Sequence, residues 1–179
     1  LRRDYDAPID DVWDAITDPE RIARWFVPVS GDLRLGGRYQ LKDQAGGEIL
    51  RCEPPQLLAV SWIYGEDVGV SEVEVRLTSS DGSTRLELEH VAVVDDARWA
   101  EFGPGAVGVG WDLIVLGLSL HLSGDLMEDP EAWSMSEGGR RYMTDSSTAW
   151  GEALRAAGGT DAEVATAVEN TTTFYVPPA

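Results

Sequence analysis

Cysteine and lysine are nearly missing from this sequence, which contains one of each among 179 residues. Because Cys52 has no second cysteine to pair with, an internal disulfide is excluded, and this fits a protein of a reducing compartment. No basic stretch followed by an apolar run opens the chain, so the pattern of a signal peptide is not present. We therefore expect a cytoplasmic protein.

Basic residues are scarce as a whole. The chain has 14 Lys and Arg residues against 32 Asp and Glu residues, which gives a formal net charge of −18. Such a charge repels phosphate backbones and anionic lipid headgroups, which argues against nucleic-acid and membrane-surface binding. A neutral small molecule or a basic partner protein fits this surface better. The apolar content of 43% is ordinary, so we expect a globular core.

Sequence motifs for metal binding and nucleophilic catalysis are also absent. Two histidines and one cysteine without HxxxH or CxxC spacing argue against a dedicated metal site, and no GxSxG turn presents a serine. Residues 103–108 match GxGxxG by letter, but a polar segment precedes them instead of a buried strand. We interpret them as a flexible loop over the binding site. We assign no metal, no cofactor and no catalytic residue.

The first 90 residues contain two different apolar periods. After a first strand, apolar residues at helical spacing predict two short helices, the second of them capped by Asp18. From Gly36 the period changes to two, which predicts five consecutive strands joined by short turns. An antiparallel meander of this kind has one apolar face, and this face must be buried against another element.

Residues 110–123 are predicted to form an apolar helix that needs cover on two sides. The apolar run is shorter than the roughly 20 residues that span a bilayer. Trp111, Val115 and Leu118 lie on one side, for which the apolar face of the meander is the predicted partner. A helix near residues 137–157 and a last helix that starts at Thr160, with Glu163 three residues on as a capping box, are the predicted cover for the other side. A homodimer interface through the long helix or the C-terminal extension is the alternative.

This order of elements predicts an α+β helix-grip fold, in which a curved antiparallel sheet wraps around a long α-helix. We predict a helix-grip domain over residues 1–126 and a helical extension over residues 127–179, both within one globule. Because a bent sheet and a straight helix cannot touch along their whole length, we expect an apolar cavity between them. The predicted ligand-binding residues are Tyr39, Leu41, Val60, Trp62, Tyr64, Val75, Leu88, His90, Trp111, Val115 and Leu118.

A resemblance supports this fold. The segments "APIDDVWDAITDPERIARWF", "GGRY" and "GGEILRCEPPQLLAVSWIY", a strand that ends in His90, and "GW" at the start of a long helix occur in this order. As a set they resemble the START/birch-pollen-allergen (SRPBCC) superfamily, and within it the homologues of the activator of the heat-shock-protein-90 ATPase. The resemblance covers about residues 1–125. It implies the helix-grip fold and a hydrophobic cavity, in a superfamily of lipid and polyketide binders, cyclases and a co-chaperone.

Three functions compete. The first is a soluble protein that binds a small hydrophobic or aromatic molecule and has no required enzymatic step. The second is a cyclase- or dehydratase-type enzyme in which His90 and a nearby tyrosine act as acid and base. The third is a co-chaperone-like module whose acidic surface meets a chaperone ATPase. We interpret His90 first as a satisfied buried histidine, and His121 as a residue that interacts favourably with the C-terminus of its own helix.

Overall fold

The chain divides into two compact units, each of which is described by itself. In the computed structural model, residues 1–64 and 71–177 are the ones described. The sheet unit comprises Leu1–Val93 and Val115–Leu126, and the helical unit comprises Val94–Ile114 and Met127–Ala179. Residues 94–114 therefore group with the C-terminal helices. Placement of both parts in one globule stays a prediction.

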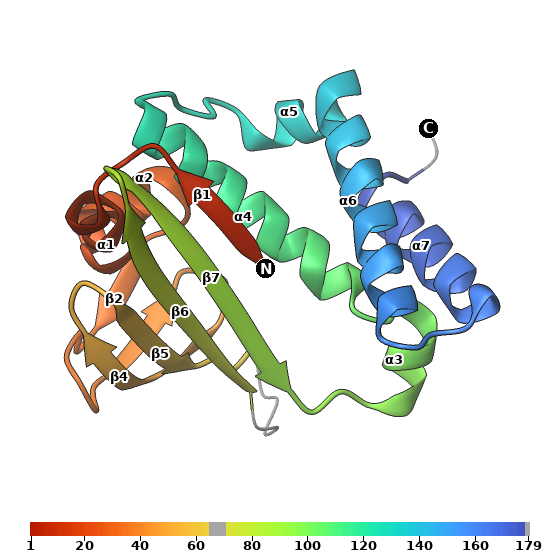
Figure 1. Cartoon of the computed structure of the whole chain (residues 1–179), viewed down its shortest axis with the longest axis horizontal. Helices are drawn as coiled ribbons and strands as arrows, with labels where there is room; N and C mark the ends of the chain where they lie inside the picture. The colour runs from red at the N-terminus through yellow and green to blue at the C-terminus, as the bar shows by residue number, and fades with distance from the viewer. Residues whose placement is uncertain (65–70, 178–179) are drawn as a thin grey trace. The chain divides into compact units, whose positions relative to one another are not determined.

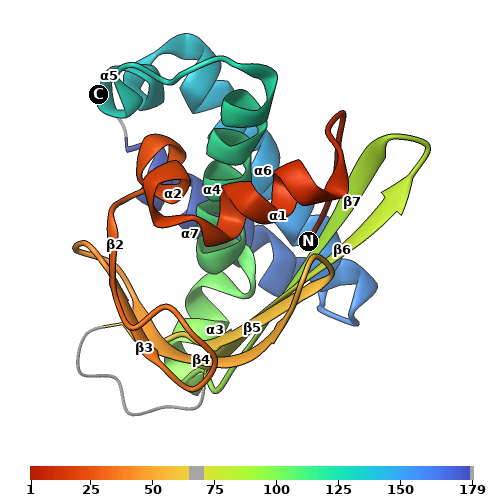
Figure 2. The ribbon, with the colours of Figure 1, turned by 90° about the vertical axis from the view of Figure 1, so that its left-hand side faces the viewer.

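The sheet unit is built on a seven-stranded antiparallel sheet, which confirms the predicted α+β helix-grip architecture (Figures 1 and 2). The strand order is β1-β7-β6-β5-β4-β3-β2. The sequence pattern missed β2, which is too short for an alternation to be recognised. The strands are β1 (Arg2–Tyr5), β2 (Val29–Gly31), β3 (Arg38–Leu41), β4 (Gly46–Glu53), β5 (Leu57–Ser61), β6 (Ser71–Ser80) and β7 (Ser83–Ala92).

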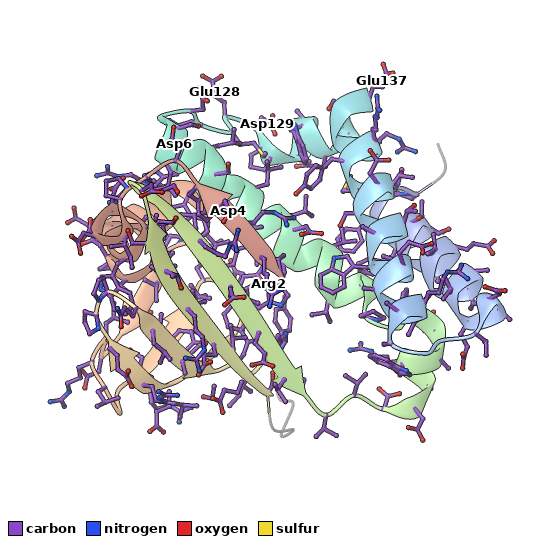
Figure 3. All side chains as sticks on the ribbon, viewed as in Figure 1. Arg2, Asp4, Asp6, Glu128, Asp129 and Glu137 are labelled. Carbon is purple, nitrogen blue, oxygen red and sulfur yellow. The ribbon has the colours of Figure 1, made fainter. Side chains whose placement is uncertain are left out.

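One face of this sheet carries ion pairs between side chains of different strands. Arg51 and Glu74 stand on either side of Ala59 in the strand register, and an ion pair of 3.3 Å joins them across it. This pair explains why Ala59 is fully buried on a charged face. At the edge strand β1, Arg2 pairs with Glu87 at 2.5 Å, and Asp4 pairs with Arg85 at 2.8 Å. Figure 3 labels Arg2 and Asp4 on this strand.

The two predicted short helices are present, and they cover part of the other face, a position that the sequence did not predict. They are α1 (Ile9–Thr17) and α2 (Pro19–Trp25), and the carboxylate of Asp18 accepts a hydrogen bond from the Arg21 backbone N–H at 2.9 Å. Helix α1 contacts β6 and β7, and its Val12 is completely buried. The hydroxyl of Thr84 on β7 donates to the carbonyl of Ala7 at 2.7 Å, which fixes the entry to α1.

Helix α4 (Gly105–Ser123) contributes to both units and begins five residues before the predicted start. The interpretation of residues 103–108 as a flexible loop was therefore wrong, because most of them are helical. In the part of the chain that the structure describes, α4 is the helix that is long and apolar enough to cross a membrane by length and composition. Its second half belongs to the sheet unit, where Leu118 is 1% exposed and the Tyr5 hydroxyl donates to the Val115 carbonyl.

The helical unit combines the first half of α4 with four further helices: α3 (Asp96–Phe102), α5 (Pro130–Met135), α6 (Glu137–Ala156) and α7 (Asp161–Tyr175). Helices α6 and α7 lie side by side (Figure 1). The predicted capping box at the start of α7 is confirmed, since Thr160 and Glu163 exchange side-chain and backbone hydrogen bonds. Helix α6 matches the helix predicted near residues 137–157.

Close packing in the helical unit explains the glycines of α4. A side chain at Gly108 would occupy the same space as the indole of Trp150, and one at Gly105 would meet the side chain of Thr171. The buried carboxylate of Asp112 accepts hydrogen bonds from the Ser146 hydroxyl at 2.6 Å and from Trp150 Nε1 at 2.9 Å. Because a buried carboxylate is costly without such donors, these bonds fix the register of α4 against α6.

Candidate functional site

The predicted ligand-binding residues on β3, on β5 and directly after β5 come together in one apolar cluster. Tyr39 and Leu41 are buried, and Val60 and Trp62 pack against them while staying partly exposed. The Tyr39 hydroxyl donates to the Ser61 carbonyl at 2.8 Å, so this polar atom is satisfied within the cluster. A tyrosine phenol is neutral near pH 7, and burial raises the pKa of Tyr39 further above its ordinary value.

The same face of the sheet continues onto β6 and β7. Val75 stands opposite Leu88, and His90 stands opposite Val73, so these side chains share the face of Val60. Leu88 and Val73 are 8% and 4% exposed, whereas Val60, Val75 and His90 are only partly buried. The far end of this hairpin, where α1 packs, is closed more fully, because Leu77 and Leu86 are 3% and 2% exposed.

We call the partly exposed group of Val60, Trp62, Val75 and His90 the inward patch. Its position matters because apolar side chains on the covered face of a sheet are normally fully buried. The side chains of this face are thus fully buried near α1, and they are only partly buried near the first residues of β6. An incompletely covered apolar face with few polar groups is the chemistry of a small-molecule site.

The polar group of the inward patch is a hydrogen-bonded pair. Ser71 Oγ lies 2.8 Å from His90 Nε2. Burial lowers the pKa of His90, so the imidazole is neutral near pH 7. Sequence reasoning identified His90 but missed Ser71, because the two are distant in sequence. The signal exists only in the strand register, where Ser71 is the diagonal neighbour of His90 across β6 and β7.

The remaining predicted ligand-binding residues have different positions. Val115 and Leu118 lie in the second half of α4 and are buried within the sheet unit. Tyr64 is 58% exposed, with its hydroxyl 3.5 Å from the Asp43 carbonyl oxygen. Trp111 is 8% exposed and belongs to the helical unit. The cavity between sheet and long helix, and the full set of lining residues, stay predictions.

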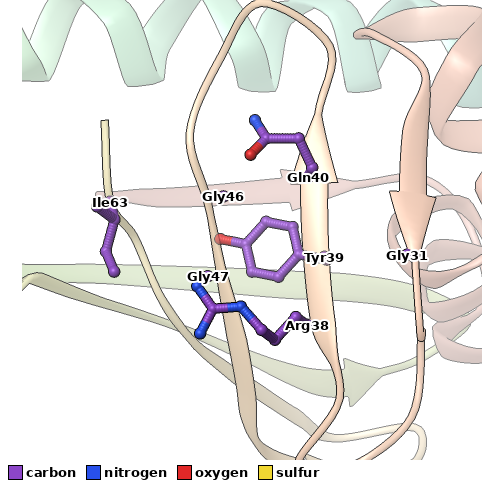
Figure 4. A pocket seen from close by; sticks show the side chains of 7 residues that line it. All are labelled: Gly31, Arg38, Tyr39, Gln40, Gly46, Gly47 and Ile63. Atoms are coloured by element: carbon purple, nitrogen blue, oxygen red, sulfur yellow. The ribbon is translucent and has the colours of Figure 1, made fainter. Parts of the chain in front are cut away.

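Among the hollows lined by described residues, two have linings that combine polar and apolar groups. One, of about 350 Å³, lies over β2, β3 and β4 and is open to solvent (Figure 4). Its lining includes three glycines with the polar side chains Arg38 and Gln40, and it shares Tyr39 with the predicted site. The other, of about 210 Å³, is lined by Val91 and by three glutamates of β6 and β7. Across residues 1–64 and 71–177, no group of His, Cys, Asp or Glu side chains is arranged to hold a metal ion.

His121 has a partner that the sequence did not reveal. Arg21 Nε lies 3.2 Å from His121 Nε2, and the same guanidinium pairs with Asp11 at 2.7 Å and Asp14 at 2.9 Å. The imidazole therefore acts as a neutral acceptor for a cation. The interpretation of His121 as a residue favoured by the terminus of its own helix omits this contact, which comes from α2.

We expect the free energy of unfolding to fall as the pH drops below about 6.5. Burial lowers the pKa of His90, and burial followed by the charges of Arg21 and Arg24 lowers that of His121. On acidification, these two histidines therefore take up protons in the unfolded chain before they do so in the folded chain. Their contribution to the free energy of unfolding is complete above the ordinary histidine pKa and is lost as the pH falls below it. Urea unfolding at about pH 7.5 and about pH 5.5 measures the loss. His121→Gln should reduce the pH dependence, and an unchanged pH dependence would contradict the role of the Arg21 contact.

Comparison with known proteins assigns the family of this helix-grip protein. The family model described as "Activator of Hsp90 ATPase homolog 1-like protein" matches residues 6–122. This match spans more than half of the chain, so the protein belongs to that family, within the SRPBCC superfamily that the sequence resembles. A comparison with curated proteins found no match.

CalU16 from Micromonospora echinospora is similar along most of its length. Its crystal structure has 42% sequence identity and a TM-score of 0.68, with 84% of this chain and 84% of CalU16 covered. Its solution structure gives 41% identity and a TM-score of 0.71, with 88% and 86% covered. Coverage of this extent exceeds what residues 1–126 alone supply, so the similarity includes part of the C-terminal helices.

Two more distant structures share the fold. DynU16, a protein of the dynemicin biosynthetic locus, has 25% identity and a TM-score of 0.61, with 70% of this chain and 47% of DynU16 covered. An Hsp90 activator from Plasmodium falciparum has 19% identity and a TM-score of 0.50, with 74% of this chain and 91% of that chain covered. The second similarity is evidence for the fold alone.

Proposed function

We propose that this protein binds a small hydrophobic or aromatic molecule at the inward patch. The observation that carries the proposal is the incomplete burial of Val60, Trp62 and Val75 on a face that is closed elsewhere. The similarity to DynU16 supports it, because that protein comes from a locus that makes a small molecule. A net charge of −18 favours a guest that is neutral.

The expected binding mode depends on Trp62. Its indole is partly exposed beside the buried pair Tyr39 and Leu41, and an aromatic guest can stack on such a ring. Loss of the indole removes this contact area as well as part of the wall of the site. The rest of the cluster stays in place, since Tyr39 keeps its hydrogen bond to Ser61.

Trp62→Ala should weaken binding of an apolar aromatic probe by about tenfold or more, because it removes a stacking contact and buried apolar area. Titration of 2-methylnaphthalene, followed by calorimetry, measures the change in Kd. Trp99→Ala is the matched control, since Trp99 is a half-exposed residue of the helical unit. Equal affinity of the Trp62→Ala protein and the unaltered protein would contradict the proposed position of the guest.

The two other hypotheses have less support in the geometry. The acid–base mechanism called for a tyrosine near His90, and the side chain that contacts Nε2 is the Ser71 hydroxyl. A chaperone partner rests on the name of the family and on the fold shared with an Hsp90 activator, and fold alone does not determine function. A pull-down of purified chaperone ATPase at low ionic strength tests the chaperone hypothesis. Retention of the chaperone by this protein would support that hypothesis.

A further inference from the structure

We propose that the Ser71–His90 pair selects the guest, and that it favours an apolar aromatic molecule carrying a hydroxyl or carbonyl oxygen. This inference rests on the proposed function, since it names the ligand class of the same site. It starts from the position of the pair on the covered face of the sheet. Ser71 begins β6, and the contact to His90 on β7 is a diagonal one within that face.

The pair lies next to apolar side chains that are open to a guest. The backbone N–H of Trp62 donates to the Ser71 carbonyl at 2.8 Å, so the serine directly adjoins the strand segment that carries the indole. Val73, the residue between Ser71 and Val75 on the same face, stands opposite both His90 and Val60. The polar pair and the apolar members of the inward patch thus form one continuous surface.

The Ser71 hydroxyl can form more hydrogen bonds than its contact to His90 uses. A neutral imidazole has one donor and one acceptor nitrogen, and a serine hydroxyl has one proton and two lone pairs. If Ser71 donates to Nε2, its oxygen keeps lone pairs that accept a hydroxyl proton from the guest. If Nε2–H donates to Ser71, the serine proton is available for a guest carbonyl. In either tautomer Ser71 therefore keeps a group for the guest oxygen, which is a lone pair for a hydroxyl or a proton for a carbonyl.

The apolar side chains around Ser71 make binding depend on whether the guest carries an oxygen. A guest oxygen that bonds to Ser71 replaces the hydrogen bonds that both groups make in water. A guest of the same shape without the oxygen covers the serine with apolar atoms and leaves the lone pairs unmet, which costs binding energy. Discrimination by one hydrogen bond of this kind is about three- to tenfold in affinity.

The test compares 2-naphthol with 2-methylnaphthalene, which have similar size and differ in one hydroxyl. The measured quantity is the ratio of the two Kd values for each variant, so intrinsic differences in hydrophobicity cancel between variants. In Ser71→Ala, the preference for 2-naphthol should fall by about three- to tenfold relative to the unaltered protein. Ser71→Thr keeps the hydroxyl and should retain most of the preference.

Ser83→Ala serves as the matched control. Ser83 lies on β7 as well, but its hydroxyl donates to the Ser80 carbonyl at the hairpin turn, away from the histidine. Its ratio should equal that of the unaltered protein. A second measurement does not depend on any variant: the ¹⁵N resonances of the His90 ring should shift more with 2-naphthol than with 2-methylnaphthalene.

The outcomes separate this inference from the function on which it rests. If 2-methylnaphthalene binds and the ratio is the same in Ser71→Ala as in the unaltered protein, the selection by Ser71–His90 is wrong while the proposed function stands. Equal ¹⁵N shifts with the two probes would overturn the selection in the same way. If neither probe binds the unaltered protein, the proposed function and the selection are both wrong.

Discussion

Gly108→Ala is expected to destabilise the helical unit by about 3 kcal/mol, because a methyl group at this position would overlap the indole ring of Trp150. Gly108 lies near the start of α4, and alanine is normally a better helix residue than glycine by up to about 1 kcal/mol. Overlap with a rigid ring outweighs that gain, since neither the helix nor the indole can move by a small amount without disturbing its neighbours. Movement of Trp150 would also break its 2.9 Å hydrogen bond to Asp112.

Gly138→Ala is the control for this substitution. Gly138 lies in the first turn of α6, and the nearest atom to an added methyl group is Ser136 Oγ at 3.9 Å. The same chemical change should therefore leave stability unchanged or raise it by up to about 1 kcal/mol. Denaturant unfolding followed by circular dichroism compares the two variants. A Gly108→Ala protein as stable as Gly138→Ala would refute the close packing of α4 on α6.

Leu118→Ala is expected to lower the free energy of unfolding by about 2–5 kcal/mol, which is the range for a buried leucine. Leu118 is 1% exposed and belongs to the second half of α4, within the sheet unit. The truncation leaves a cavity in addition to the lost apolar contacts. Val115, one turn earlier on the helix, is 3% exposed, so this stretch of α4 is part of the core.

Leu126→Ala provides the comparison, because Leu126 lies shortly after the same helix and is 65% exposed. Its effect should stay within about 0.5 kcal/mol. Urea midpoints of the two variants at equal protein concentration measure the difference. If both substitutions have the same small effect, the second half of α4 is not held in the core, and the helix-grip arrangement of the sheet unit would need revision.

Features that depend on neighbouring residues were predictable from the sequence. The cap at Asp18 and the capping box at Thr160 and Glu163 were recognised because each involves residues three apart. The meander was recognised because its alternation is long. Strand β2 was missed because three residues cannot show an alternation, and its existence depends on pairing with β3.

Features that depend on distant residues were not predictable. The glycines near Gly105 and Gly108 look like a loop, since their helical state depends on Thr171 and Trp150, which lie far along the chain. Ser71 reaches His90 only through the register of β6 on β7, which the pattern of a single strand does not contain. The apolar strand residues were named correctly as a group, but their unequal burial reflects where α1 covers the sheet.

The glycine content of α4 links the first half of this helix to the C-terminal helices. Gly108 and Gly110 each weaken an isolated helix by up to about 1 kcal/mol, and both fall inside the region that the family model matches. Trp150 of α6 and Tyr175 of α7 lie against these two glycines, so the packing that offsets this weakness comes from the C-terminal helices. A relative without α6 and α7 would have to replace these glycines. Glycines in the first half of α4 and the C-terminal helices should therefore occur together among relatives.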